Sequence, residues 1–358
     1  MTGDRPPEWA YAAALAGLPY MAWDKLAGLL ADGRPSAAWR RVAAGGAGQP
    51  WRHAAAATSV AEVEAAHRRA GVAVHLAGDA AVPAALAADH EAPAVLFVRG
   101  DAGAASAGPM VGIVGTRRCT GYGRDVARQL GRELSSAGVG LVSGLALGID
   151  GAAHEGALAA GAAPPVAVVG SGLDVVYPRR HAGLWERVAA AGALLSEAPA
   201  AARPEPWRFP ARNRLIAALA DVVVVVESHA AGGSMHTVRA AAERSVTVMA
   251  VPGPVRSAAS MGTNRLLADG CPPVCDTGDV LVALALERAG APPPADGRRQ
   301  PEAEDAAVLE LLGWEAVSID ELLAGTDLTP GRLSVALTRL EHDGWARGRA
   351  GWWERVGP

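Results

Sequence analysis

Lysine is almost missing from this sequence: Lys25 stands alone among 33 basic residues, and the others are arginines. The positive charge is therefore carried by guanidinium groups, whose planar fork of donors suits the oxygens of phosphates. Acidic residues number 37, so the formal net charge is −4. That balance argues against a protein that coats nucleic acid through its overall charge.

Cysteine is scarce as well, and long apolar runs are missing. Cys119, Cys271 and Cys275 cannot form a disulfide framework, and the last two lack the spacing and the companion ligands of a zinc site. No uncharged apolar stretch reaches the roughly 18 residues of a membrane span, and residues 1–9 lack the basic and then apolar order of a signal peptide. We therefore predict a cytoplasmic protein with no metal site and no membrane contact.

Charge is distributed unevenly along the chain. Residues 111–270 hold 16 basic and 12 acidic residues, whereas residues 301–358 hold 5 and 11. The net charges of these segments are +4 and −6. Only the middle of the chain is basic, so a phosphate-binding site is expected there.

The two ends of the chain differ in pattern from its centre. Residues 1–69 predict a small helical domain of the SAM or helix-hairpin-helix type, in which residues 15–33 favour a helix, a tight turn and a second helix. Its four tryptophans are more typical of a core than of a base-stacking surface. Residues 289–301 have the proline, glycine and charge content of a linker, and residues 302–358 predict three helices and a short hairpin, a winged-helix-like domain.

Apolar, strand-like runs occupy the centre of the chain. The runs at 72–76 and 94–98 flank a short helix, and the later runs alternate with amphipathic helices. Strands that are apolar on both faces and separated by helices indicate a parallel sheet covered on both sides. The predicted fold class is α/β, with a Rossmann-like domain over 70–288. The later runs are 110–115, 139–144, 165–170, 193–198, 221–228 and 246–253.

Small residues and two adjacent arginines, Arg117 and Arg118, follow the predicted strands. A ligand of an open parallel sheet binds at the carboxyl ends of its strands, where backbone N–H groups are free. Glycine and serine let a phosphate approach the backbone, and arginine can bind it with two donors. These glycines could instead only make tight turns, but their convergence on one edge favours an anion site. Its members are Gly115, Thr116, Arg117, Arg118, Ser143, Gly144, Gly170, Ser171 and Gly172.

A dinucleotide cofactor is not expected. The segment 112–123 lacks the G-x-G-x-x-G pattern, and the second strand ends in Ser143-Gly144 where an acid would hold the ribose. A hydride-transfer enzyme is therefore excluded and no cofactor is predicted, although a mononucleotide could still fit.

Aromatic and basic residues gather just before a helix expected at 211–220. Residues 207–214 (WRFPARNR) contain three arginines and two aromatic rings. Phe209 is either a stacking platform for a nucleobase or a hydrophobic staple for the helix. In the first case Arg208, Arg212 or Arg214 would contact the adjacent phosphates, which favours single-stranded nucleic acid as the ligand.

Asp150 and His154 are spaced to share one helix face, a pattern that acid–base catalysis or metal binding would use. No third ligand and no nucleophile accompany them, so we interpret Asp150 as a helix N-cap and His154 as a packed residue. His181 and His236 also fall near helix starts without an acidic or nucleophilic partner. No catalytic residue is predicted.

These motifs, taken in order, resemble the DprA/Smf family of DNA-processing proteins, and the resemblance runs from about residue 70 to 285. It implies a non-enzymatic protein that binds single-stranded DNA, forms a homodimer through its Rossmann-like domain and loads RecA recombinase in natural transformation or recombination. The motifs are VLFVRG (95–100), GIVGTR (112–117) with YG (122–123), SGLA (143–146), GID (148–150), AH (153–154), GSGLD (170–174), YP (177–178), LSE (195–197), FPARNR (209–214), VPG (251–253) and GTN (262–264).

The resemblance also assigns roles to residues. Gly115, Thr116 and Arg117 match the phosphate-gripping turn of the family, and Phe209, Arg212 and Asn213 belong to the same pocket. The segment 232–238 (GGSMHTV) departs from the usual SGSLITA but keeps a backbone nest at Gly233 and Ser234.

Two other functions are compatible with parts of the sequence. Rossmann-like phosphoribohydrolases carry a PGGxGTxxE loop, and residues 232–240 contain its glycine pair and a threonine but lack the glutamate. A regulator could bind duplex DNA through the winged helix, with a recognition helix near 329–342 bearing Arg332 and Arg339, and Arg347 and Arg349 on the wing. The net charge of −6 in that segment argues against tight duplex binding.

Overall fold

A computed structural model describes residues 5–31, 33–284 and 298–357 of the chain. The chain forms two compact units, Met1–Gly290 and Ala291–Pro358, and each is described by itself. Most of the predicted linker, residues 289–297, lies outside the described residues.

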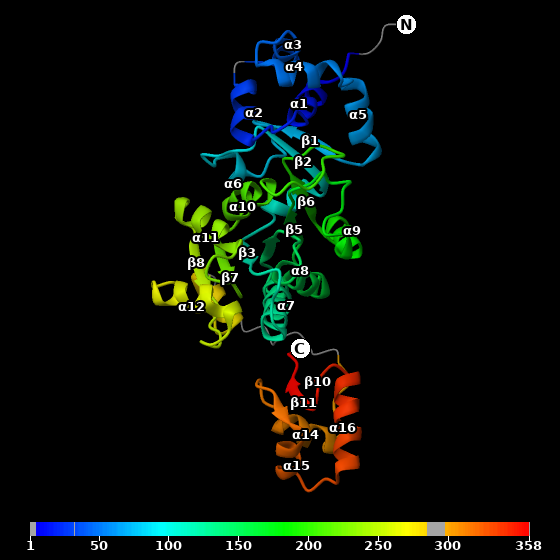
Figure 1. Ribbon diagram of the computed structural model, residues 1–358, viewed down its shortest axis with the longest axis vertical. Helices are drawn as coiled ribbons and strands as arrows, with labels where there is room; N and C mark the ends of the chain where they lie inside the picture. Colours follow the sequence, from blue (N-terminus) through cyan, green and yellow to red (C-terminus); the bar gives the residue numbers. More distant parts are fainter. Residues whose placement is uncertain (1–4, 32, 285–297, 358) are drawn as a thin grey trace. The chain divides into compact units, whose positions relative to one another are not determined.

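Five short helices open the first unit, as Figure 1 shows in blue. They do not form an independent core, because Leu15 of α1 and Val42 of α3 pack in one cluster with Phe97 and Leu194 of the sheet. Residues 15–33 hold the end of α1, a turn that begins at Gly17, and α2, so the first helix of the predicted pair starts earlier than expected, at Glu8. The helices are α1 (Glu8–Ala16), α2 (Trp23–Leu30), α3 (Pro35–Ala43), α4 (Gln49–Ala56) and α5 (Val60–Arg69).

An eight-stranded sheet forms the centre of this unit, and all the predicted strand runs lie in it. The strand order is β1-β2-β6-β5-β4-β3-β7-β8. The six strands from β3 to β8 are parallel, whereas β1 and β2 pair antiparallel at one edge. The strands are β1 (Ala73–Leu76), β2 (Val95–Gly100), β3 (Met110–Val114), β4 (Gly140–Ser143), β5 (Pro165–Val168), β6 (Ala193–Ser196), β7 (Val222–Val225) and β8 (Thr247–Ala250).

Helices cover both faces of this sheet, as predicted for a Rossmann-like domain (Figure 1). Side chains of β3 alternate between two cores: Val111 and Ile113 pack on one face, and Met110 and Val114 on the other. The alternation follows from the two-residue period of a strand. The helices are α6 (Ala84–Ala87), α7 (Gly121–Ser136), α8 (Ile149–Ala160), α9 (Ala182–Ala191), α10 (Arg208–Leu219), α11 (Ser234–Glu243), α12 (Met261–Ala268) and α13 (Thr277–Ala283).

The order of the strands reverses next to β3. From β3 the chain builds β4, β5 and β6 outward on one side, and it then returns to place β7 and β8 on the other side. The carboxyl ends of β3 and β7 are therefore neighbours at a topological switch point, where open α/β sheets bind their ligands.

The second unit is a winged helix with a core of its own, which contains Val308, Leu333 and Leu337. The three predicted helices and the hairpin are present, and the hairpin gains a two-residue third strand, β9, that was too short to predict. The elements are α14 (Ala303–Leu311), β9 (Val317–Ser318), α15 (Ile319–Ala324), α16 (Pro330–His342), β10 (Ala346–Arg349) and β11 (Trp352–Arg355), with sheet order β10-β11-β9.

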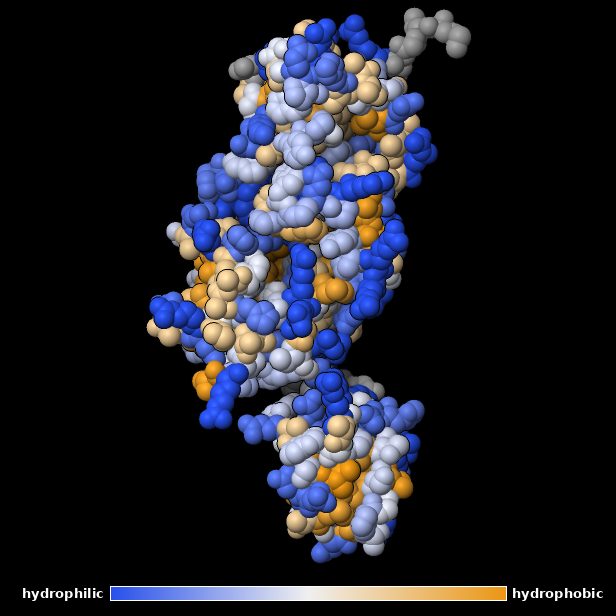
Figure 2. Space-filling view, viewed as in Figure 1, coloured by the Kyte–Doolittle hydropathy of each residue, from blue (hydrophilic) through white to orange (hydrophobic). Residues whose placement is uncertain are grey.

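Most of the surface visible in Figure 2 is hydrophilic, with small hydrophobic patches between the polar side chains. Within the described parts of the chain, no helix has both the length and the apolar character needed to cross a membrane.

Candidate nucleic-acid interface

A pocket of about 540 Å³ opens where the carboxyl ends of β3 and β7 meet. We call it the strand-end pocket. Its walls come from the loop after β3, the first turns of α8, α10 and α11, and the loop after β7. Among the residues that line it are Gly115, Thr116, Arg117, Arg118, Asp150, Tyr177, Phe209, Arg212, Asn213, His229, Gly233, Ser234 and His236.

The loop after β3 is held in place by Glu227, which is 1% exposed. The backbone N–H and the hydroxyl of Thr120 donate to its carboxylate at 2.8 and 2.6 Å, and the N–H of Thr116 donates to its carbonyl at 2.8 Å. A Cβ on Gly115 would lie 2.5 Å from the side chain of Ile149, so only glycine fits there. The loop is therefore rigid at its base.

Arg117 and Arg118 stand exposed at the tip of this loop. The guanidinium carbon of Arg117 lies 5.0 Å from the centroid of the Phe209 ring, and the Tyr177 ring lies 5.4 Å from the same ring. The expectation that Arg117 and Phe209 border one hollow is therefore confirmed. An arginine beside two aromatic rings is an arrangement that can hold both a phosphate and a stacked base.

Phe209 lies in the first turn of α10 and not in a loop before it. The helix begins at Arg208, three residues earlier than predicted, so the placement of residues 208–210 in a loop was wrong. Pro210 lies in the same turn, because proline is tolerated in the first turn of a helix, where its missing N–H has no partner to lose.

Arg212 lies at the floor of the pocket and is 6% exposed. Its Nη1 donates to the carbonyl of Gly144 at 2.9 Å and also to that of Val168, and its Nε donates to Asn213 Oδ1 at 3.0 Å. Burial lowers its pKa to about 10, although the Asp150 carboxylate opposes this shift. Arg212 therefore anchors α10 to the ends of two strands and adds positive charge from below.

Asp150 was wrongly predicted to be an N-cap. The N-cap of α8 is Gly148, whose φ of 83° suits glycine, and no side chain caps this helix. Asp150 lines the pocket, and burial raises the pKa of its carboxyl while Arg212 lowers it. The packing prediction for His154 is confirmed, because it is 0% exposed and burial lowers its pKa to about 3.

Several predicted site residues back the pocket and do not line it. Ser143 is buried and donates to the carbonyl of Ile113 at 2.5 Å, and Ser171 donates to that of Val175 at 2.8 Å. A smaller cavity of about 40 Å³ beside the pocket is lined by Gly144, Gly170 and Ser171 together with Arg117, Phe209 and Arg212. Gly172 borders neither hollow.

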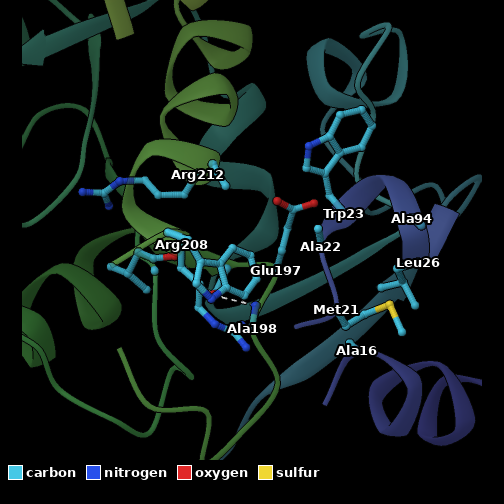
Figure 3. Close-up of a pocket in the computed structure, with 15 residues that line it drawn as sticks. Ala16, Met21, Ala22, Trp23, Leu26, Ala94, Glu197, Ala198, Arg208 and Arg212 are labelled. Carbon is cyan, nitrogen blue, oxygen red and sulfur yellow. Dashed lines mark hydrogen bonds between the residues drawn. The ribbon is translucent and has the colours of Figure 1, made fainter. Parts of the chain in front are cut away.

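Arg208 and Arg214 lie toward the N-terminal helices. A cavity of about 40 Å³ there has Met21, Trp23 and Leu26 on one side and Glu197 and Arg208 on the other, while Arg212 points away from it (Figure 3). Arg214 Nη2 pairs with Glu197 Oε1 at 2.7 Å, and its guanidinium carbon lies 4.7 Å from the Trp23 ring. These contacts join α2 to α10 and leave Arg214 unavailable to a phosphate in the strand-end pocket.

The pocket contains residues that the sequence analysis did not select. Tyr177, His229 and His236 all line it. His229 follows β7 and His236 lies in the first turn of α11. The rule that a ligand of an open parallel sheet binds at the carboxyl ends of its strands could therefore have identified both residues. Tyr177 and His236 lie in motifs that gave them no role, and His229 lies outside every motif.

In the winged-helix unit, the predicted recognition helix is α16. Its two arginines are paired with acids of α14: Arg332 with Glu304, and Arg339 with Asp305 at 2.6 and 2.8 Å. The positive charge that would face a duplex is therefore largely compensated.

Comparison with known proteins gives matches over both units. Residues 73–285 match the family described as DNA recombination-mediator protein A, and residues 291–351 match the DprA winged helix domain. A DprA sequence from Mycobacterium tuberculosis is 40% identical over 266 residues, which are 73% of this chain and 68% of that relative.

Two solved structures align with the fold. The X-ray structure of DprA from Streptococcus pneumoniae gives a TM-score of 0.63 at 27% identity and covers 78% of this chain and 98% of that one. A DNA processing protein A from Helicobacter pylori, whose structure concerns its single-stranded DNA binding mode, gives a TM-score of 0.54 at 30% identity and covers 60% of this chain and 95% of that one.

Proposed function

The chain belongs to the DprA/Smf family of DNA-processing proteins, and from this membership we propose that it binds single-stranded DNA in the strand-end pocket and acts as a recombination mediator. The observation that carries the proposal is the joint placement of Arg117, Arg118 and Phe209 at the mouth of a pocket of about 540 Å³. Exposed guanidinium groups attract phosphates, and an aromatic ring accepts any base.

The pocket geometry supports single strands over duplexes. A stacked base must leave its partner strand, and the pocket offers the Phe209 ring with Arg117 and the Tyr177 ring beside it. The Helicobacter pylori relative, whose structure concerns single-stranded DNA binding, supports the same ligand here. We expect contacts from Gly115, Thr116, Arg117, Arg118, Phe209, Asn213, Gly233 and Ser234, with Arg212 contributing charge from below.

Family membership also supports the assembly that we propose. The protein would act as a homodimer with two strand-end pockets, and would load RecA on the bound strand during natural transformation or recombination in the cytoplasm. We propose functional domains at 1–69, 70–288 and 302–358, of which the second holds the DNA.

A gel-shift experiment tests the proposal with single- and double-stranded oligonucleotides of one sequence. We expect the single strand to bind more tightly and Arg117→Ala to weaken that binding. Arg187→Ala is the matched control, because Arg187 is exposed on α9 and does not line the pocket. Equal affinity for both ligands, or an Arg117→Ala variant that binds like the wild type, would contradict the proposal.

We propose binding without chemistry. The alternative, a nucleotide-cleaving enzyme, is tested by incubating the purified protein with nucleoside monophosphates and measuring the released base. No release is expected, since the glycine-pair segment after β7 lacks the glutamate of the phosphoribohydrolases.

A further inference from the structure

Two histidines of the strand-end pocket are not among the residues that we expect to contact the strand in the proposed function. His229 lies four residues after the end of β7, and His236 is the third residue of α11. Both side chains are exposed and line the same pocket as Arg117 and Arg118. Histidine is the side chain whose charge changes between about pH 5 and pH 8, so these two residues can change the charge of the pocket.

The ring of His229 is oriented by one contact. Its Nδ1 lies 3.0 Å from the carbonyl oxygen of Ala258. Because a carbonyl oxygen only accepts hydrogen bonds, Nδ1 carries a proton, and Nε2 is the nitrogen left for a ligand. A protonated Nε2 donates to a phosphate oxygen, whereas a neutral Nε2 presents a lone pair that repels it.

His236 lies at the positive end of a helix. Gly233 is the N-cap of α11, and no side chain caps this end. The helix dipole there stabilises an anion and opposes a second positive charge. A phosphate bound at this end of α11 would therefore meet both the helix dipole and the His236 side chain.

Other charged groups line the same pocket as the two histidines: three guanidinium groups and one buried carboxylate. A bound phosphate adds negative charge within the pocket and shifts the balance toward protonation. The charged groups concerned are Arg117, Arg118 and Arg212 from the facing elements, Asp150 from α8, and Arg239 on α11 itself.

We infer that His229 and His236 are additional phosphate-binding residues of the strand-end pocket and that they take up protons when a single strand binds. The inference rests on the proposed function, because it requires strand phosphates in this pocket. Proton uptake on binding means that affinity increases as pH falls, by linkage.

The first test is the affinity for fluorescent oligo-dT at about pH 8, 7 and 6, measured by anisotropy at fixed ionic strength. Thymine and phosphodiesters keep their charge over this range, so the ligand contributes no change. We expect binding to tighten on the order of tenfold from pH 8 to pH 6. A wild-type affinity that is the same at all three values would overturn the inference.

Variants assign this pH dependence to the two residues. His229→Asn keeps a donor for the Ala258 carbonyl, and His236→Gln keeps a neutral polar side chain. The double variant is expected to bind oligo-dT with little dependence on pH. His53→Gln is the control, because His53 is exposed on α4 and does not line the pocket; it should keep the full dependence. A double variant as pH-dependent as the wild type would refute the assignment.

Calorimetry measures the protons directly, through titrations near pH 7 in buffers of different ionisation enthalpy. The wild type should take up protons on binding, and each single variant should take up fewer. Arg117→Ala should bind more weakly at every pH and still take up protons. If the wild type binds the strand without proton uptake, this inference fails and the proposed function stands. If no single strand binds at any pH, the proposed function itself fails.

Discussion

Arg117 and Phe209 lie 92 positions apart in the sequence, yet the guanidinium carbon of one is 5.0 Å from the ring centroid of the other. Fold topology produces this contact, because β3 and the first turn of α10 meet at the switch point of the sheet. The two side chains therefore act on a ligand together.

Phe209→Ala should weaken binding of single-stranded DNA, because one stacked base contributes about 1–3 kcal/mol. Phe209→Tyr keeps a ring and should retain most of the affinity. In a double-mutant cycle with Arg117→Ala, the losses should not add, since the two side chains are in contact. The binding free energies are measured by anisotropy. Strictly additive losses in the cycle, or a Phe209→Ala variant with the affinity of the wild type, would mean that the base does not stack on Phe209.

Binding should depend strongly on salt. If about four phosphates are neutralised on a single strand, the affinity should fall about fiftyfold between roughly 50 and 200 mM monovalent salt. A plot of log affinity against log salt concentration gives the number of phosphates. Removing one contact, as in Arg118→Ala, should make the slope shallower by about 0.7, whereas Arg187→Ala should leave it unchanged. A salt-independent affinity would rule out phosphate contacts.

Thr120→Ala should destabilise the fold. The Thr120 hydroxyl accepts from the N–H of Gly123 at 3.1 Å as the cap of α7, and it donates to buried Glu227 at 2.6 Å. Losing both bonds should cost about 1–3 kcal/mol in the free energy of unfolding. Urea denaturation measures this loss. Ser136→Ala, at the exposed end of the same helix, should stay within about 0.5 kcal/mol of the wild type.

Acid should destabilise the first unit through His154. Burial lowers the pKa of this side chain from 6.5 to about 3, so the unfolded chain binds more protons than the folded chain between these values. The contribution of neutral His154 to the free energy of unfolding is complete above about pH 6.5. It is lost as the pH falls below that value, by up to about 1.4 kcal/mol per pH unit.

Urea denaturation at several values between about pH 5 and pH 7 checks this expectation. His154→Gln should show a shallower dependence of the unfolding free energy on pH, whatever its absolute stability. His53→Gln should follow the wild type, because its side chain is exposed. If His154→Gln has the slope of the wild type, other groups account for the acid sensitivity.

The sequence predicted the sheet well because its strands are buried on both faces, which leaves unbroken apolar runs such as 222–226. The resemblance to the DprA/Smf family also placed Arg117 and Phe209 in one pocket, as the structure does. The sequence did not predict that β1 and β2 are antiparallel to their neighbours, because an apolar run carries no information about strand direction.

The remaining differences concern burial and helix boundaries. Arg212 and Asp150 were assigned by residue type, and only the fold, which brings the first turns of α8 and α10 to the same edge of the sheet, shows that both side chains are nearly enclosed. The helix α10 begins three residues earlier than predicted, because its first turn tolerates Pro210. His229 and His236 belong to the pocket through tertiary placement alone.

The N-terminal helices share one core with the sheet, since Leu15 packs in the same cluster as Phe97 and Leu194. Removing residues 1–69 would uncover the face of β2 that packs against these helices and expose a broad apolar area to water, which favours aggregation. The isolated fragment 70–288 is therefore an unsuitable reagent, and a shortened protein for solution work should keep residues 1–290. If a fragment without α1 and α3 failed to bind DNA, poor solubility would explain the loss before a direct role of those helices in binding did.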